Sequence, residues 1–121
     1  MGKYVIKETK SGVKFDLKAG NGEVIGTSEV YTTLAACKNG IESVRKNAPK
    51  ANVEDQTKGE EGVKHPKFEL YQDKSGEYRF RLKATNGEII LVSEGYKAMT
   101  SCKNGVDSVV KNADSEVVTE E

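Results

Sequence analysis

One segment of the chain occurs twice. Residues 37–48, which begin Cys-Lys-Asn-Gly, return almost unchanged at residues 102–113. When residues 13–49 are aligned with residues 78–114, 20 of the 37 pairs are identical. Agreement over this length indicates an internal duplication, so we expect two copies of one supersecondary unit. Each copy alone would be marginally stable, because a chain of half this length buries too little surface.

The repeated segment has the spacing of an amphipathic helix. At 100° per residue, the apolar side chains of a helix over residues 32–47 gather on one face. These are Leu34, Cys37, Ile41, Val44 and Ala48, with Met99, Cys102, Val106, Val109 and Ala113 in the second copy. Pro49 then ends the first helix. We expect this apolar face of each helix to contribute to the core.

A stripe of small side chains lies beside the apolar face. It consists of Ala36, Gly40, Ser43 and Asn47, repeated as Ser101, Gly105, Ser108 and Asn112. Glycine inside a helix costs about 0.8 to 1 kcal/mol relative to alanine, so some contact should offset that cost. The favoured interpretation is that both glycines let another backbone approach closely. A glycine that faces a ligand is the alternative.

The residues before each helix have the patterns of strands. Residues 13–19 and 78–84 alternate apolar and polar side chains, which is typical of a strand with one buried face. Asn21-Gly22 and Asn86-Gly87 predict two-residue type I′ turns into the next strand. That register points Ile25 and Ile90 away from the core; a slipped register is the other interpretation, and both stay open.

These patterns predict an α+β protein with two tandem β-β-β-α-β repeats. We assign residues 1–55 to the first repeat, 56–66 to an exposed linker and 67–121 to the second repeat. The two repeats should form one compact pseudo-twofold unit, because neither has enough apolar area to fold comfortably alone. The expected state is a monomer that contains an internal pseudo-dimer.

The duplicated motif resembles the YegP family of small bacterial proteins. The resemblance is carried by an Asn-Gly hairpin followed by Glu and two aliphatics, a Ser-Glu…Tyr segment and the Cys-Lys-Asn-Gly helix. It covers nearly the whole chain and implies no known activity. It does imply two units joined by exchange of their last strands, here the segments around Val53 and Val118. Gly26 and Thr27 depart from Leu91 and Val92 of the other copy, so the halves differ in hydrophobicity.

Charge and cysteine usage exclude several classes of protein. The chain has 19 basic and 19 acidic residues, so no net charge attracts nucleic acid or a membrane over long range. It contains no apolar run near the 18 or so residues of a membrane span and no hydrophobic secretion signal, which predicts a cytoplasmic protein. Cys37 and Cys102 are expected to be buried thiols, not a disulfide.

The sequence lacks a recognisable catalytic or cofactor motif. It has no Gly-rich phosphate loop after a strand, no Ser/His/Asp set and no metal-ligand spacing. We therefore expect no enzyme and no cofactor, and a non-enzymatic binding or interaction module is the first hypothesis. The sequence does not identify the partner, and a protein is one candidate. A nucleophilic Cys37 or Cys102 is disfavoured, because burial raises a thiol pKa and lowers its reactivity.

Nucleic-acid binding through a basic sheet face is the alternative function. The candidate anion contacts alternate with core residues on the two central strands, and they are Lys14, Lys18, Arg79, Arg81 and Lys83. Asp16 interrupts the first row, and the chain shows no exposed aromatic run for base stacking. An ordinary solvated sheet face is therefore the favoured interpretation of these residues.

Overall fold

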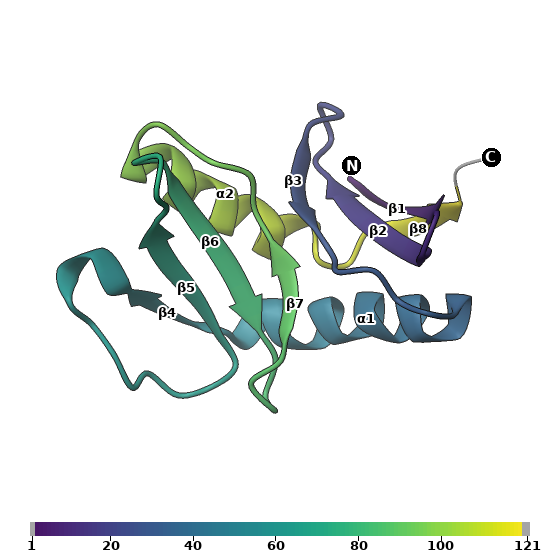
Figure 1. Ribbon diagram of the computed structural model, residues 1–121, viewed down its shortest axis with the longest axis horizontal. Helices are drawn as coiled ribbons and strands as arrows, with labels where there is room; N and C mark the ends of the chain where they lie inside the picture. Colours follow the sequence, from purple (N-terminus) through teal and green to yellow (C-terminus); the bar gives the residue numbers. More distant parts are fainter. Residues whose placement is uncertain (1, 120–121) are drawn as a thin grey trace.

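A computed structural model describes residues 2–119, which form one eight-stranded mixed sheet and two helices. The strands lie in the order β4-β5-β6-β7-β3-β2-β1-β8 (Figure 1). Their bounds are β1 Lys3–Thr9, β2 Gly12–Lys18, β3 Val24–Thr27, β4 Asn52–Asp55, β5 Lys67–Gln72, β6 Tyr78–Lys83, β7 Ile89–Val92 and β8 Glu116–Thr119. The helices are α1 (Leu34–Asn47) and α2 (Met99–Asn112), with short 3₁₀ turns η1 (Ala48–Lys50) and η2 (Gln56–Lys58). The predicted α+β class is confirmed.

The fourth and eighth strands each pair with a strand from the other half of the chain. β4 runs parallel to β5, with Val53 opposite Phe68, and β8 runs parallel to β1, with Val117 opposite Tyr4. At the centre of the sheet, β3 and β7 meet through one residue pair, Thr27 and Val92. β4 and β8 are consequently the two edges of the sheet (Figure 1).

The hairpin turns differ from the predicted type. Ala19 N donates to Glu23 O, and Gly22 N donates to Ala19 O, both at 2.9 Å. Three residues therefore form the loop, and of these only Gly22 has a positive φ, of 87°. This is a type I turn followed by a glycine bulge. The type I′ prediction was wrong because Asn21 keeps a negative φ and its side chain accepts a hydrogen bond from Glu23 N at 3.0 Å.

The longer loop changes which residues face the core. Lys18 lies opposite Val24, whereas Leu17 lies opposite Gly26, so the pairing register of β2 and β3 shifts by one residue between Leu17 and Lys18. Ile25 is 7% exposed and Ile90 is 6% exposed, and both belong to the core. The slipped register is thus correct, and the outward orientation of these isoleucines was wrong.

The core lies between the sheet and the helices and is built around edge-to-face aromatic pairs. Tyr4 packs on Phe15 with ring centroids 5.7 Å apart, and Phe68 packs on Phe80 at 5.8 Å. The predicted apolar helix face is buried except at its start. Leu34 is 45% exposed, because it is the first residue of α1, directly after the N-cap Thr33.

Both cysteines are buried and free, as the sequence predicted. Burial raises the pKa of the Cys37 thiol, and it raises the pKa of the Cys102 thiol to about 11. A raised pKa leaves little reactive thiolate at neutral pH, which weakens the case for a cysteine nucleophile.

The helix glycines make room for aromatic rings. A Cβ at Gly40 would lie 2.7 Å from Tyr31 Cζ, and a Cβ at Gly105 would lie 3.0 Å from Tyr96 Cζ. Each of these tyrosines stacks on a core phenylalanine with a centroid distance of 6.4 Å. The expected backbone-to-backbone contact at these glycines was therefore wrong, although both are buried and the helices run through them without a break.

Candidate functional site

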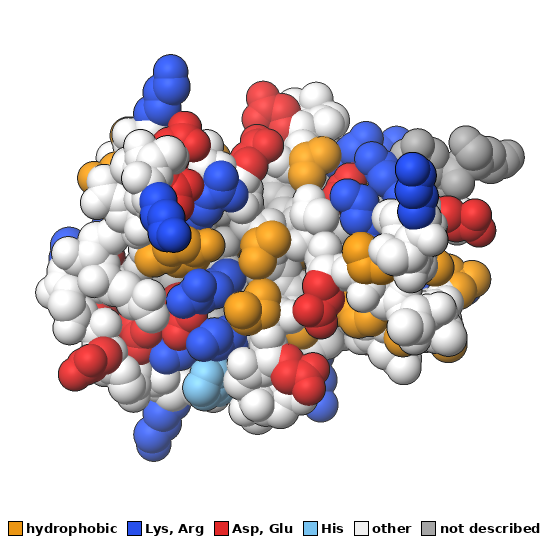
Figure 2. All heavy atoms as spheres, in the orientation of Figure 1, with side chains coloured by type: hydrophobic (Ala, Val, Ile, Leu, Met, Phe, Trp, Pro, Cys, Tyr) orange, Lys and Arg blue, Asp and Glu red, His pale blue; other side chains and the backbone are white. Residues whose placement is uncertain are grey.

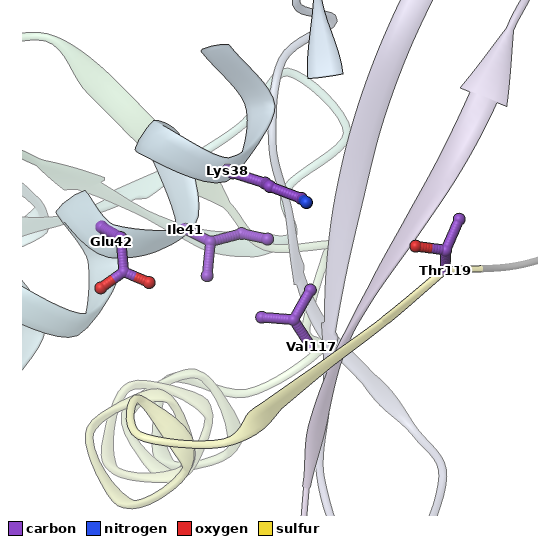
Figure 3. Close-up of a pocket in the computed structure, with 5 residues that line it drawn as sticks. All are labelled: Lys38, Ile41, Glu42, Val117 and Thr119. Atoms are coloured by element: carbon purple, nitrogen blue, oxygen red, sulfur yellow. The ribbon is translucent and has the colours of Figure 1, made fainter. Parts of the chain in front are cut away.

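A groove separates α1 from β8 at one edge of the sheet (Figure 3). We call it the α1–β8 groove; its volume is about 330 Å³, and it is lined by Lys38, Ile41, Glu42, Val117 and Thr119. Ile41 is fully buried and forms the apolar floor, whereas Val117 is 36% exposed on the strand. Side chains alternate along a strand, so Val117 and Thr119 share the face that looks toward α1.

A related groove lies at the opposite edge. The α2–β4 groove has a volume of about 240 Å³ and is lined by Val53, Leu70, Lys103, Val106 and Asp107. Its three helix residues are the repeat counterparts of Lys38, Ile41 and Glu42. Val53 is 48% exposed and occupies the place on β4 that Val117 has on β8. A lysine, an aliphatic floor, an acid and an exposed valine thus recur at both edges.

Arg45 holds the segment that leads into β8. Its guanidinium lies 5.5 Å from the centre of the Tyr4 ring and donates to Ser115 O at 2.6 Å. It also forms an ion pair with Glu42, which neutralises the acid of the α1–β8 groove. Within residues 2–119, Lys38 has no ion-pair partner, so its charge is the uncompensated one in this groove.

The two sheet edges differ in how far the chain itself occupies them. At the end of β4, Asp55 N donates to Glu60 Oε1 at 2.8 Å, and Glu60 N donates to Asp55 O at 3.3 Å. In the described part of the chain, β8 makes hydrogen bonds only with β1. The α1–β8 groove therefore has the more open edge.

The five predicted anion contacts do not form one continuous row. Lys14 and Lys18 lie on β2, whereas the other three lie on β6, with β3 and β7 between them. Arg79 pairs with Asp73 at 2.6 Å, and Glu69 pairs with Arg81 at 2.6 Å and with Lys83 at 3.2 Å. Figure 2 shows positive and negative side chains next to each other over β5 and β6. These ion pairs reduce the positive potential that the phosphate backbone of a nucleic acid would meet at this face. Nucleic-acid binding through these residues stays a prediction.

Sequence patterns did not predict an ionic cluster beneath residues 56–66. Lys67 Nζ lies 2.9 Å from Glu54 Oε2 and 3.3 Å from Glu69 Oε2, and all three side chains are buried. Glu54 also accepts hydrogen bonds from Gln56 Nε2 at 2.8 Å and Val63 N at 2.9 Å. The cluster ties the connecting segment to the sheet. In the sequence, the only indication of this cluster is that Lys67 and Glu69 flank Phe68. Any strand with one solvated face could show the same pattern.

Acid should weaken this cluster. Hydrogen bonds from Gln56 and Lys67 lower the pKa of Glu54 from its ordinary 4.5 to about 2. A carboxyl whose pKa is lower in the folded state stabilises the protein above its unfolded pKa and loses that contribution as pH falls through the folded value. We expect urea unfolding to show stability falling between about pH 4.5 and 2, and falling less in Glu54→Gln. Parallel pH profiles for the two proteins would contradict the assignment.

Among the described residues, no helix is long and apolar enough to cross a membrane. The same part of the chain contains no group of three His, Cys, Asp or Glu side chains placed to hold a metal ion.

The fold and the edge grooves define a small α+β protein in which two helices and a mixed sheet share one core. The family model for a domain of unknown function, DUF1508, matches residues 10–55 and 73–120. The chain belongs to this family. The two matched ranges contain the two copies of the duplicated segment.

Relatives and solved structures agree with this membership. The chain is 40% identical to the UPF0339 protein YegP of Yersinia pestis over 98% of its own length and 94% of that protein. A UPF0339 protein of Mannheimia succiniciproducens is also 40% identical, over 98% and 93% of the two chains. The solution NMR structure of yegP from E. coli, described as a protein of unknown function, has a TM-score of 0.80 at 33% identity, covering 98% of this chain and 92% of that one. These names assign no activity to the relatives.

Proposed function

We propose that this protein is a non-enzymatic binding module that accepts an extended segment of a partner protein as an added strand at the sheet edge. The observation that carries the proposal is the recurrence of one groove at both edges, built from equivalent residues of the two halves. A strand and a groove beside it are the two parts that strand addition uses.

An open edge supplies main-chain hydrogen bonds. An edge strand has a row of unpaired N–H and C=O groups, and proteins commonly protect such strands with charged side chains or proline. Here Val53 and Val117 instead leave apolar surface exposed on the two edge strands. In strand addition, backbone hydrogen bonds provide affinity and the side-chain groove provides selectivity.

The proposal extends to the organisation of the chain. Residues 1–55 and 67–121 would be two repeats joined by the linker 56–66 and related by a pseudo-twofold axis near the Thr27–Val92 pair. The strand order, which reads similarly from either edge, supports this arrangement. The module would then have two related sites, with the α1–β8 groove as the main one because Glu60 already bonds to the end of β4.

A titration followed by NMR tests the proposal. Adding the peptide Thr-Thr-Thr-Val-Thr-Thr-Thr should shift amide signals of β8 and of α1 near Ile41. The variant Val117→Asp should abolish these shifts, because it places a charge on the apolar wall of the groove. Val110→Asp is the matched control, since Val110 is 38% exposed on α2 and lines neither groove.

Two results would oppose the proposal. Peptide-induced shifts that survive Val117→Asp would place binding elsewhere. Shifts caused by a single-stranded oligonucleotide at Lys14, Lys18 and β6, lost steeply as salt rises, would instead favour the nucleic-acid alternative.

A further inference from the structure

We infer that the α1–β8 groove selects a partner segment in which an acidic side chain lies two positions from the aliphatic side chain that enters the groove. The inference rests on the proposed function, and it adds the chemistry of the partner. It is carried by the position of Lys38 relative to the apolar floor and by the partners of the other charged groups around the groove.

The groove has an apolar centre and one basic end. Figure 3 shows Ile41 and Val117 facing each other, the Lys38 side chain extending toward the Thr119 side, and Glu42 beyond Ile41 on the other side. An added strand would direct every second side chain into the groove, about 7 Å apart. If one of these contacts Ile41 and Val117, the next one toward Thr119 lies beside Lys38.

Lys38 is the charge that such a segment would meet. The carboxylate of Glu42 is paired with Arg45, and Arg45 is held in place by Ser115 O. Lys38 has no ion-pair partner in the described part of the chain. Glu116 lies opposite Lys3 of β1, and alternation along β8 places it on the face away from α1. A carboxylate beside Lys38 would therefore be attracted, and an ammonium group would be repelled.

The expected selectivity is modest because Lys38 is exposed. Exposed ion pairs contribute roughly 0.2 to 1 kcal/mol, which corresponds to at most about a fivefold change in Kd. Salt at about 1 M reduces the Debye length to about 3 Å and should remove most of the preference. The order of the two side chains also indicates how the bound segment runs relative to β8. The acid precedes the aliphatic residue in a segment antiparallel to β8 and follows it in a parallel one.

Charge-matched peptides test the inference on the full chain. The probes are Thr-Glu-Thr-Val-Thr-Thr-Thr and its Gln and Lys analogues, with a second set that carries the variable residue two positions after valine. NMR titration read at β8 and α1 amides should give the lowest Kd for a Glu peptide, roughly 1.4- to fivefold below its Gln analogue, and the highest for Lys. Lys38→Glu should reverse this order. Lys103→Glu, the matched change in the α2–β4 groove, should leave it unchanged.

The possible outcomes distinguish a failure of this inference from a failure of the proposed strand-binding function. If the Glu, Gln and Lys peptides bind equally, or if the preference survives Lys38→Glu, charge selection by Lys38 is wrong while strand binding stands. If no peptide shifts the β8 and α1 amides, the proposed function itself fails.

Discussion

A fragment that ends after Asp55 should not exist as a stable folded monomer. In the whole chain, β4 pairs with β5 and β1 pairs with β8. The fragment lacks β5 and β8, so it loses both pairings. The fragment would retain three paired strands and one helix, which bury too little apolar surface to offset the entropy of the ordered chain. We expect it to be unfolded, or to dimerise by placing β4 of each copy on β1 of the other. Light scattering after gel filtration, with circular dichroism, distinguishes these states.

The complementary fragment, residues 56–121, provides the control. Mixing the two fragments restores the partners of β4 and β1, so we expect a folded heterodimer with a thermal transition close to that of the intact protein. A cooperative, concentration-independent transition of residues 1–55 as a monomer would show that the first half is an independent domain.

The substitution Gly40→Leu should destabilise the protein by roughly 1 to 3 kcal/mol, the usual cost of overpacking. Leucine has a better helix propensity than glycine by almost 1 kcal/mol. The substitution can therefore lower the free energy of unfolding only if there is no room for the larger side chain at position 40. Even a Cβ at Gly40 would lie 2.7 Å from Tyr31 Cζ. Tyr31 is held by backbone hydrogen bonds of 2.8 and 2.7 Å to Val13 and by stacking on Phe15, so its ring cannot easily move away.

Three further variants isolate the cause of this destabilisation. Asn39→Ala changes the adjacent, exposed helix residue and should be neutral or stabilising by about 0.5 kcal/mol. Combining Gly40→Leu with Tyr31→Ala opens space, so the double variant should be less destabilised than the sum of the single changes. Urea unfolding of the wild type and of the four variants, with Tyr31→Ala measured alone as well, gives the free energies that this comparison needs. A stabilising effect of Gly40→Leu alone would mean that Tyr31 does not confine this position.

Local sequence patterns predicted the elements correctly where one periodic signal dominates. The apolar spacing of Cys37, Ile41 and Val44 indicated α1 through an unfavourable Asn-Gly pair, because burial of that face outweighs the propensity cost. The alternation around Phe15 and Phe80 indicated β2 and β6 in the same way. Of the candidate site, Ile41 and Val106 were recognised as core residues, but nothing in the sequence indicated that each also forms the floor of a groove.

The sequence by itself determined the duplicated segment, which alignment of residues 13–49 with 78–114 shows directly. It also determined the α+β class and the burial of the two cysteines, because these follow from periodicities within single segments. Only the tertiary structure decided the hairpin register, the ring that faces Gly40, the Glu54–Lys67 cluster and the position of each groove. The physical reason is that these features depend on contacts between different elements of the fold or on competing turn geometries of similar energy, neither of which a periodic pattern within one segment reports. Val117 becomes a groove wall only because β8 crosses to β1 and leaves its outer edge beside α1.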